Sequence, residues 1–191
     1  MPEKIIYNGQ IHHDDWHILR LAETDNPATI SVPASTTARY LIPLSVWQAQ
    51  QITLQPALQN GLVSLWLTGT DHPADIAELL PQLKLIAVDF PKFADGRGYS
   101  VASLLRSRYH YRGELRAIGE VLRDQFTYLT RCGFNSLQPP EGKYTSPQLE
   151  AALVSLHTFS EPYQGAIDTP EPLFRRRNRN NTPAPVTENR P

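Results

Sequence analysis

The feature that most constrains the fold is a regular alternation of apolar segments with amphipathic ones between residues 62 and 138. The segments "LVSLWLTG", "KLIAVDF" and "GELRAIGE" have the length and composition of buried strands. Each is followed by a stretch with apolar residues at helical spacing, and "FNSLQ" closes the series as a short fourth strand. Successive strand–helix units predict parallel strands joined by right-handed crossovers. We therefore predict an α/β domain with a mostly parallel sheet, either open or curled into a partial barrel.

The helices between these strands have recognisable boundaries. We predict helices over 72–83, 99–111 and 121–133. Gly133 ends the last of them, where a glycine with positive φ is the usual C-terminal cap. A further helix over about 147–159 is expected to dock on the sheet through its apolar face.

The chain on either side of this βα core is less regular. Asn8 and Gly9 stand where a two-residue hairpin turn would sit, so we predict an N-terminal β-hairpin region. A short helix is expected after Ser45. We assign residues 1–165 to a single domain. The stretch 166–191 is polar, basic and rich in proline, and we predict a disordered tail because it has too few apolar residues to offset its ordering entropy.

Charge and composition exclude several classes of protein. The net charge is −1, and the tail 171–191 carries five arginines against two glutamates, so the rest of the chain is acidic and nucleic-acid binding is not expected. The sequence has neither a membrane-spanning apolar stretch nor the pattern of a secretory signal, which favours a cytoplasmic protein. A single cysteine, Cys132, excludes an internal disulfide, and no metal site or cofactor is expected.

Candidate ligand-binding residues cluster after two of the predicted strands. In parallel α/β sheets, ligands bind beyond the carboxyl ends of the strands. The first cluster is Asp95, Gly96, Arg97, Gly98, Tyr99 and Ser100, and the second is Arg116, Glu120, Arg123, Asp124 and Gln125. The strand ends also carry Asp89 and Gln138. Glycines admit a ligand close to the backbone, a helix start offers N–H groups and guanidinium groups bind oxyanions. We therefore predict an arginine-rich site for an oxyanion or a partner protein, without an assigned catalytic residue.

Both clusters also have a purely structural interpretation. The residues 95–96 can form a simple turn, and Arg97 can pair with a nearby carboxylate. Arg116 lies on the strand itself, where a buried charge needs a partner such as Glu114 or Asp124. The sequence leaves both interpretations open.

Three motifs in order give the chain a family resemblance. "FPKFADGRGYSVASLLR", "GELRAIGEVLRDQ" and "RCGF" resemble a family of small, uncharacterised bacterial proteins labelled as oxidoreductases involved in sulfite reduction and typically encoded beside assimilatory sulfite reductase. The resemblance covers about 80–159. His110 departs from the pattern, because a glycine is expected at that position.

The resemblance implies a role in sulfur metabolism, but the chemistry limits that role. Sulfite reduction needs a sirohaem and an iron–sulfur cluster, whose ligands are normally cysteine thiolates, and one cysteine cannot supply them. We therefore expect an accessory protein that binds an oxyanion, sulfite reductase or another sulfur-assimilation protein. One alternative is a small oxidoreductase or other enzyme with Asp95 or Glu120 as acid or base and an anionic substrate held by arginines. Another is an interaction module that binds through its basic tail.

Overall fold

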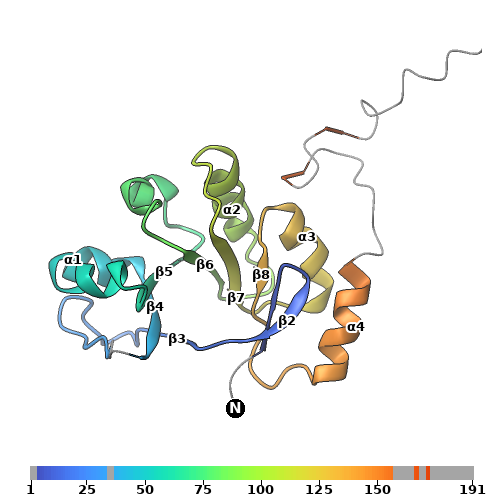
Figure 1. Cartoon of the computed structure of the whole chain (residues 1–191), viewed down its shortest axis with the longest axis horizontal. Coiled ribbons are helices and arrows are strands. Elements are labelled where there is room, and N and C mark those ends of the chain that lie inside the picture. The colour runs from blue at the N-terminus through green and yellow to red at the C-terminus, as the bar shows by residue number, and fades with distance from the viewer. Residues whose placement is uncertain (1–3, 34–36, 157–165, 168–170, 173–191) are drawn as a thin grey trace, which may run out of the picture.

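The predicted α/β architecture is confirmed in the computed structural model, which describes residues 4–33, 37–156, 166–167 and 171–172. Its sheet has the strand order β2-β1-β8-β7-β6-β5-β4-β3, and β3 to β8 are parallel (Figure 1). The strands are β1 (Lys4–Tyr7), β2 (Gln10–His13), β3 (Trp16–Ile18), β4 (Arg39–Pro43), β5 (Val63–Leu67), β6 (Leu85–Phe90), β7 (Glu114–Gly119) and β8 (Ser136–Leu137). The helices are α1 (Leu44–Gln59), α2 (Arg97–Ser107), α3 (Phe126–Arg131) and α4 (Ser146–Leu156), with short 3-10 helices η1 (Pro73–Leu79) and η2 (Arg123–Gln125).

The sheet is curled into a half-barrel, and the connectivity explains why. Its two edge strands, β2 and β3, are consecutive in the chain and are joined only by Asp14 and Asp15. A link of this length reaches at most roughly 11 Å between the Cα atoms of His13 and Trp16. The two edges of an eight-stranded sheet can come that close only if the sheet curls. Of the two predicted forms, the structure therefore has the partial barrel.

The N-terminal hairpin forms at the predicted turn. β1 and β2 are antiparallel, and Tyr7 pairs with Gln10, which leaves Asn8 and Gly9 as the two-residue loop. Their φ angles are 48° and 75°, and two positive φ angles are what the favoured type I′ turn requires. β1 also pairs with β8, so the hairpin extends the parallel sheet at one edge.

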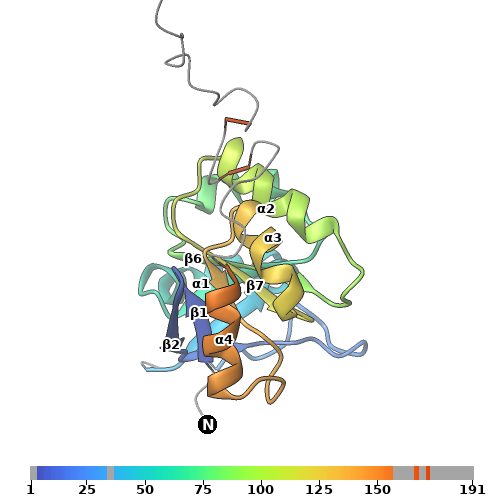
Figure 2. The ribbon, with the colours of Figure 1, turned by 90° about the vertical axis from the view of Figure 1, so that its right-hand side faces the viewer.

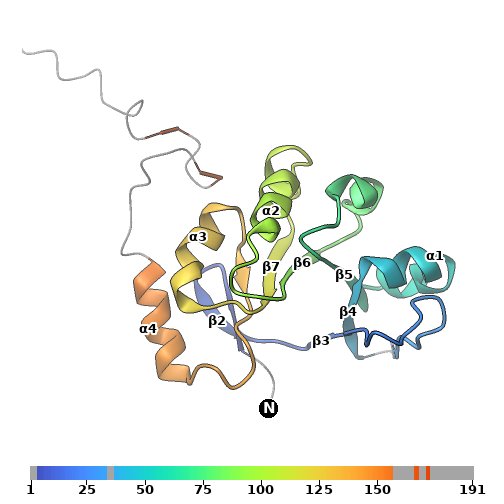
Figure 3. The same ribbon diagram turned by 180° about the vertical axis from the view of Figure 1, so that it is seen from behind.

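The two faces of the half-barrel have different contents. Along β7, Leu115 and Ala117 belong to the main core under the helices. Figure 3 shows α1, α2 and α3 along this convex side of the sheet. The alternate residue Ile118 points to the concave side, into a small cluster with Trp66 against which Trp16 packs. Apolar side chains therefore also pack on the concave side of the half-barrel.

Several of the predicted helices differ from expectation. α1 is not short and does not begin after Ser45, since it spans Leu44–Gln59 with Pro43 at the N-cap position. α2 spans Arg97–Ser107, whereas 99–111 was predicted. The segment 72–83 forms the 3-10 helix η1 and not an α-helix, since Pro81 has no N–H group and restricts the residue before it. The predicted helix over 121–133 is divided into η2 and the shorter α3. Its end is as predicted: Gly133 has φ +108°, and its N–H group and that of Phe134 donate to the carbonyls of Thr130 and Leu129 in a Schellman motif.

The predicted docking helix is α4, which packs beside the hairpin and α3 (Figure 2). Leu149 and Ala152 are buried on the predicted face, and Lys4 Nζ donates to Ser146 Oγ at 2.7 Å. Most of the predicted tail lies outside the described residues, although the Ile167 N–H group donates to the Arg131 carbonyl at 3.0 Å. Within the described ranges, no helix has the length and apolar character needed to cross a membrane.

Candidate functional site

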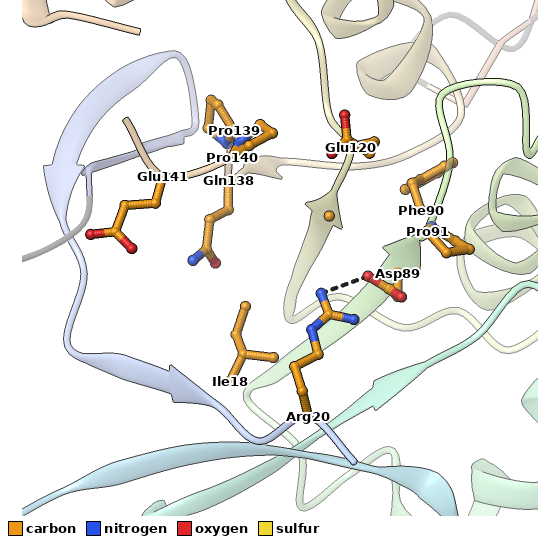
Figure 4. A pocket seen from close by; sticks show the side chains of 11 residues that line it. Ile18, Arg20, Asp89, Phe90, Pro91, Glu120, Gln138, Pro139, Pro140 and Glu141 are labelled. Carbon is orange, nitrogen blue, oxygen red and sulfur yellow. Dashed lines mark hydrogen bonds and ion pairs between the residues drawn. The ribbon is translucent and has the colours of Figure 1, made fainter. Parts of the chain in front are cut away.

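A cavity of about 410 Å³ opens at the carboxyl edge of the parallel strands (Figure 4). This volume falls within the roughly 300–1,000 Å³ typical of small-molecule sites, and the edge is where α/β sheets bind ligands. β3, β6, β7 and β8 all end here. The lining residues are Ile18, Arg20, Asp89, Phe90, Pro91, Gly119, Glu120, Gln138, Pro139, Pro140 and Glu141. We call this hollow the strand-end cavity.

Arg20 provides the cation of the strand-end cavity. The Leu19 N–H group donates to the Leu41 carbonyl and the Leu19 carbonyl accepts from Trp66 Nε1, so the chain is fixed just before Arg20. The guanidinium carbon lies 5.1 Å from the centroid of the Trp66 ring, and one nitrogen donates to Asp89 Oδ1 at 2.8 Å. Its side chain is 46% exposed, whereas that of Asp89 is 8% exposed. Among the residues described, Asp89 is its one hydrogen-bond acceptor, so further N–H donors of this cavity-lining side chain are available to a ligand.

The end of β7 shapes the opposite wall. Gly119 has φ +89°, and a Cβ atom there would lie 2.5 Å from the Phe90 carbonyl oxygen and 2.7 Å from Asp89 Oδ1. Only glycine allows β6 and β7 to approach so closely at this edge. The next residue, Glu120, donates its N–H group to the same carbonyl at 2.7 Å and presents an exposed carboxylate. Asp89 and Glu120 thus stand on adjacent strand ends.

Beneath the cavity, Arg116 belongs to a buried ion-pair network. Its guanidinium donates to Asp14 Oδ2 at 2.7 Å, to Glu114 at 2.8 and 2.9 Å, and to Gln138 Oε1 at 3.3 Å. Glu114 is one of the predicted partners. Asp14, in the link between β2 and β3, was not foreseen. Desolvation outweighs the attraction of Arg116 and raises the pKa of Asp14.

The network also reaches the strand-end cavity. Gln138 both accepts a hydrogen bond from Arg116 and lines the cavity, so Arg116 holds a cavity residue without lining the cavity itself.

Ser136 lies beside Arg116 on the neighbouring strand, and its Oγ atom has no hydrogen-bond partner among the described residues.

The residues of the first predicted cluster lie at the N-terminus of α2. Arg97 pairs with Asp95 at 2.7 Å, and its hydrogen bonds lower the pKa of that carboxyl to about 2. The flanking glycines do not adopt positive φ angles. Gly98 is instead required for packing, because a Cβ atom there would lie 2.8 Å from the Phe90 ring. Ser100 is exposed, and Gly96 occupies the N-cap position.

The residues of the second cluster connect loops and helices. Gln125 is buried and donates to the Phe93 carbonyl at 3.2 Å and to the Tyr99 hydroxyl at 3.3 Å, so it joins the loops after β6 and β7. Arg123 donates to the Ala151 carbonyl on α4 at 3.3 Å, and Asp124 is exposed.

The structure therefore brings few of the predicted site residues together. Arg97, Arg116 and Arg123 have no common partner within the described part of the chain, and none of them lines the strand-end cavity. Of the residues in the two predicted clusters, only Glu120 lines it, together with the strand-end residues Asp89 and Gln138. The cavity centres on Arg20, a residue that sequence reasoning missed because nothing in "HILRLA" indicates that β3 adds to the parallel sheet.

The arrangement is suited to binding a small polar ligand. One guanidinium, three carboxylates and the buried amide of Gln138 meet at the cavity, with apolar walls from proline and aromatic side chains. The described residues contain no group of three or more His, Cys, Asp or Glu side chains that could hold a metal ion. Cys132 lies on the convex side of the sheet, where burial raises the pKa of its thiol.

Comparison with known proteins identifies the family of the chain. A search of curated proteins and a search of solved structures each found no match. A family model described as "Bacterial protein of unknown function (DUF934)" matches residues 64–174, which is more than half of the chain. The match includes the strand ends that carry Asp89, Glu120 and Gln138, whereas Arg20 precedes it. The chain therefore belongs to this bacterial family of unknown function, DUF934.

Proposed function

We propose that this protein is an accessory protein of assimilatory sulfite reduction that binds a small oxyanion in the strand-end cavity. The observation that carries the proposal is the guanidinium of Arg20, which stacks on Trp66, is anchored by Asp89, lines the cavity and keeps further N–H donors available. An anchored guanidinium is a strong ligand for a carboxylate, sulfite or sulfate group, because its fork of donors is already oriented. The link to sulfite reduction rests on the resemblance of the sequence motifs.

Anion binding is tested by calorimetric titration with sulfite and sulfate and with Arg20→Gln. We expect millimolar affinity for at least one anion, and a loss of about tenfold or more in the variant. Arg39→Gln is a matched control: Arg39 is 47% exposed, stacks over Trp16 and pairs with an aspartate, but lies away from the strand-end cavity. Absence of binding, or an equal loss in the two variants, would refute the proposal.

The link to sulfur assimilation needs a separate test. Purified protein is mixed with sulfite reductase, and complex formation is measured by size-exclusion chromatography and by reductase turnover. We expect association or a change in turnover. If neither occurs with an intact anion site, the sulfite assignment fails and the anion-binding assignment stands alone.

An enzymatic role is a second candidate, because Asp89 and Glu120 stand on adjacent strand ends and line the same cavity as Arg20. Arg20 would hold an anionic substrate, and the exposed Glu120 would donate or accept a proton. Glu120→Gln would then abolish turnover of a bound anion while leaving its affinity within about threefold. A bound anion that is never converted would leave only the accessory role.

A further inference from the structure

The lining of the strand-end cavity carries more negative charges than positive ones. Its lining has three carboxylates, those of Asp89, Glu120 and Glu141, against the single guanidinium of Arg20. Arg20 and Asp89 neutralise one another at 2.8 Å. Within the described residues, Glu120 and Glu141 form no ion pair, so they leave two uncompensated negative charges at the cavity.

These two carboxylates belong to separate loops that are both held in place. Glu120 follows Gly119, and its backbone N–H group is fixed on the Phe90 carbonyl. Glu141 follows Pro139 and Pro140, whose rings restrict the backbone of the loop after β8. Figure 4 shows Arg20 on one side of the cavity, with Glu120 and Glu141 at different points of its border. Positive charge is therefore favoured near the border, and negative charge is favoured only next to Arg20.

A purely anionic ligand is expected to bind this arrangement more weakly than a ligand that also carries a positive charge. A dianion on Arg20 would face the two uncompensated carboxylates across a cavity of about 410 Å³. Like charges within one cavity repel each other, although exposure to water and salt weakens this repulsion. A ligand that also carries an ammonium group would turn the repulsion into attraction.

From this charge pattern we infer that the ligand of the strand-end cavity is a small zwitterion, whose oxyanion head binds Arg20 and whose ammonium group is attracted by the negative charge of Glu120 and Glu141 at the cavity border. This inference rests on the proposed anion site and specifies its ligand class. The short apolar segment of the ligand, between its two charged groups, would contact Ile18, Pro139 and Pro140.

The test uses pairs of compounds that differ only in the ammonium group. Taurine is compared with ethanesulfonate, and β-alanine with propionate, by calorimetric titration of the full-length protein. We expect each zwitterion to bind about tenfold more tightly than its partner, as for the attraction of one ammonium group to two exposed carboxylates. The two pairs also show whether a sulfonate or a carboxylate head is preferred.

Two conservative variants locate the source of the preference. Glu120 and Glu141 are exposed, and Gln has nearly the same shape as Glu, so Glu120→Gln and Glu141→Gln are expected to preserve the fold. Each should reduce the zwitterion preference about threefold, and the double variant should abolish it. Glu78→Gln is the control, because it removes the same charge from η1, away from the cavity, and should leave the preference unchanged.

The outcomes distinguish a failure of the zwitterion inference from a failure of the proposed anion site. Equal, Arg20-dependent binding of both members of each pair would overturn the zwitterion and leave the anion site standing. A preference that survives in the double variant would likewise overturn the assignment to Glu120 and Glu141. If no compound binds up to about 50 mM, far weaker than useful small-ligand affinities, both the anion site and the zwitterion are overturned.

Discussion

Removing the guanidinium of Arg116 would leave Asp14 and Glu114 without their cation inside the half-barrel. The Arg116 side chain is 1% exposed and that of Asp14 is 3% exposed, so water cannot replace the lost contacts. Asp14 lies in the two-residue link that holds the sheet edges together, so this contact also fastens the curl of the sheet. We predict that Arg116→Met strongly destabilises the protein.

The structure indicates the size of the effect. Removal of one member of a buried ion pair costs about 3–5 kcal/mol, which is a large part of the roughly 5–15 kcal/mol that stabilises a domain. Asp14→Asn should cost less, about 1–3 kcal/mol, because Arg116 keeps Glu114 as its partner. The double variant should be less destabilised than the sum of the two single variants.

The loss should depend on pH. Burial already raises the pKa of Asp14, and removal of Arg116 raises it further. A group with a raised pKa in the folded state stabilises the fold at low pH and loses that contribution as the pH rises. The destabilisation of Arg116→Met should therefore be larger at pH 8 than at pH 5.

Urea unfolding followed by circular dichroism at both pH values measures these differences. A loss below about 1 kcal/mol for Arg116→Met, typical of surface changes, would refute the buried network. A larger loss for Asp14→Asn than for Arg116→Met would also contradict this reasoning.

Three further predictions concern single residues. Gly119→Ala should lower the free energy of unfolding in urea by about 2–4 kcal/mol and weaken anion binding. The reason is that φ +89° disfavours a side chain and that the Cβ atom would clash with the backbone of β6. A decrease below about 1 kcal/mol would be inconsistent with this geometry. His110→Gly should raise stability by about 0.5 kcal/mol, because φ +53° favours glycine, and a decrease would contradict the assigned turn. Cys132 should react with iodoacetamide at pH 7.5 about tenfold more slowly than glutathione, because burial raises its pKa, and unfolding in urea should remove the difference.

Local sequence signals predicted much of the fold. The alternation of strands and helices, the turn at Asn8–Gly9 and the cap at Gly133 each depend on residues close together in the chain. The departure at His110 coincides with a left-handed backbone conformation, which agrees with the glycine expected there. The 3-10 form of η1 shows the limit, since apolar spacing alone does not distinguish it from an α-helix.

The site was harder to predict, because it depends on how distant segments meet. Asp89 and Gln138 could be placed at strand ends from the sequence, but Arg20 reaches the strand-end cavity only because the sheet curls and β3 pairs with β4. Conversely, "DGRG" looks like a ligand loop in the sequence. In the structure, Arg97 is paired with Asp95 and Gly98 is needed for packing.

The most direct test of the account is an NMR titration of ¹⁵N-labelled protein with taurine and with sulfite, read as backbone chemical-shift changes. The changes are expected to cluster at residues 18–20, 89–90, 119–120, 138 and 141, where the backbone has N–H groups, and to disappear in Arg20→Gln. Changes that cluster instead at 95–100 and 123–125, or no changes at all, would contradict a ligand site at the strand-end cavity.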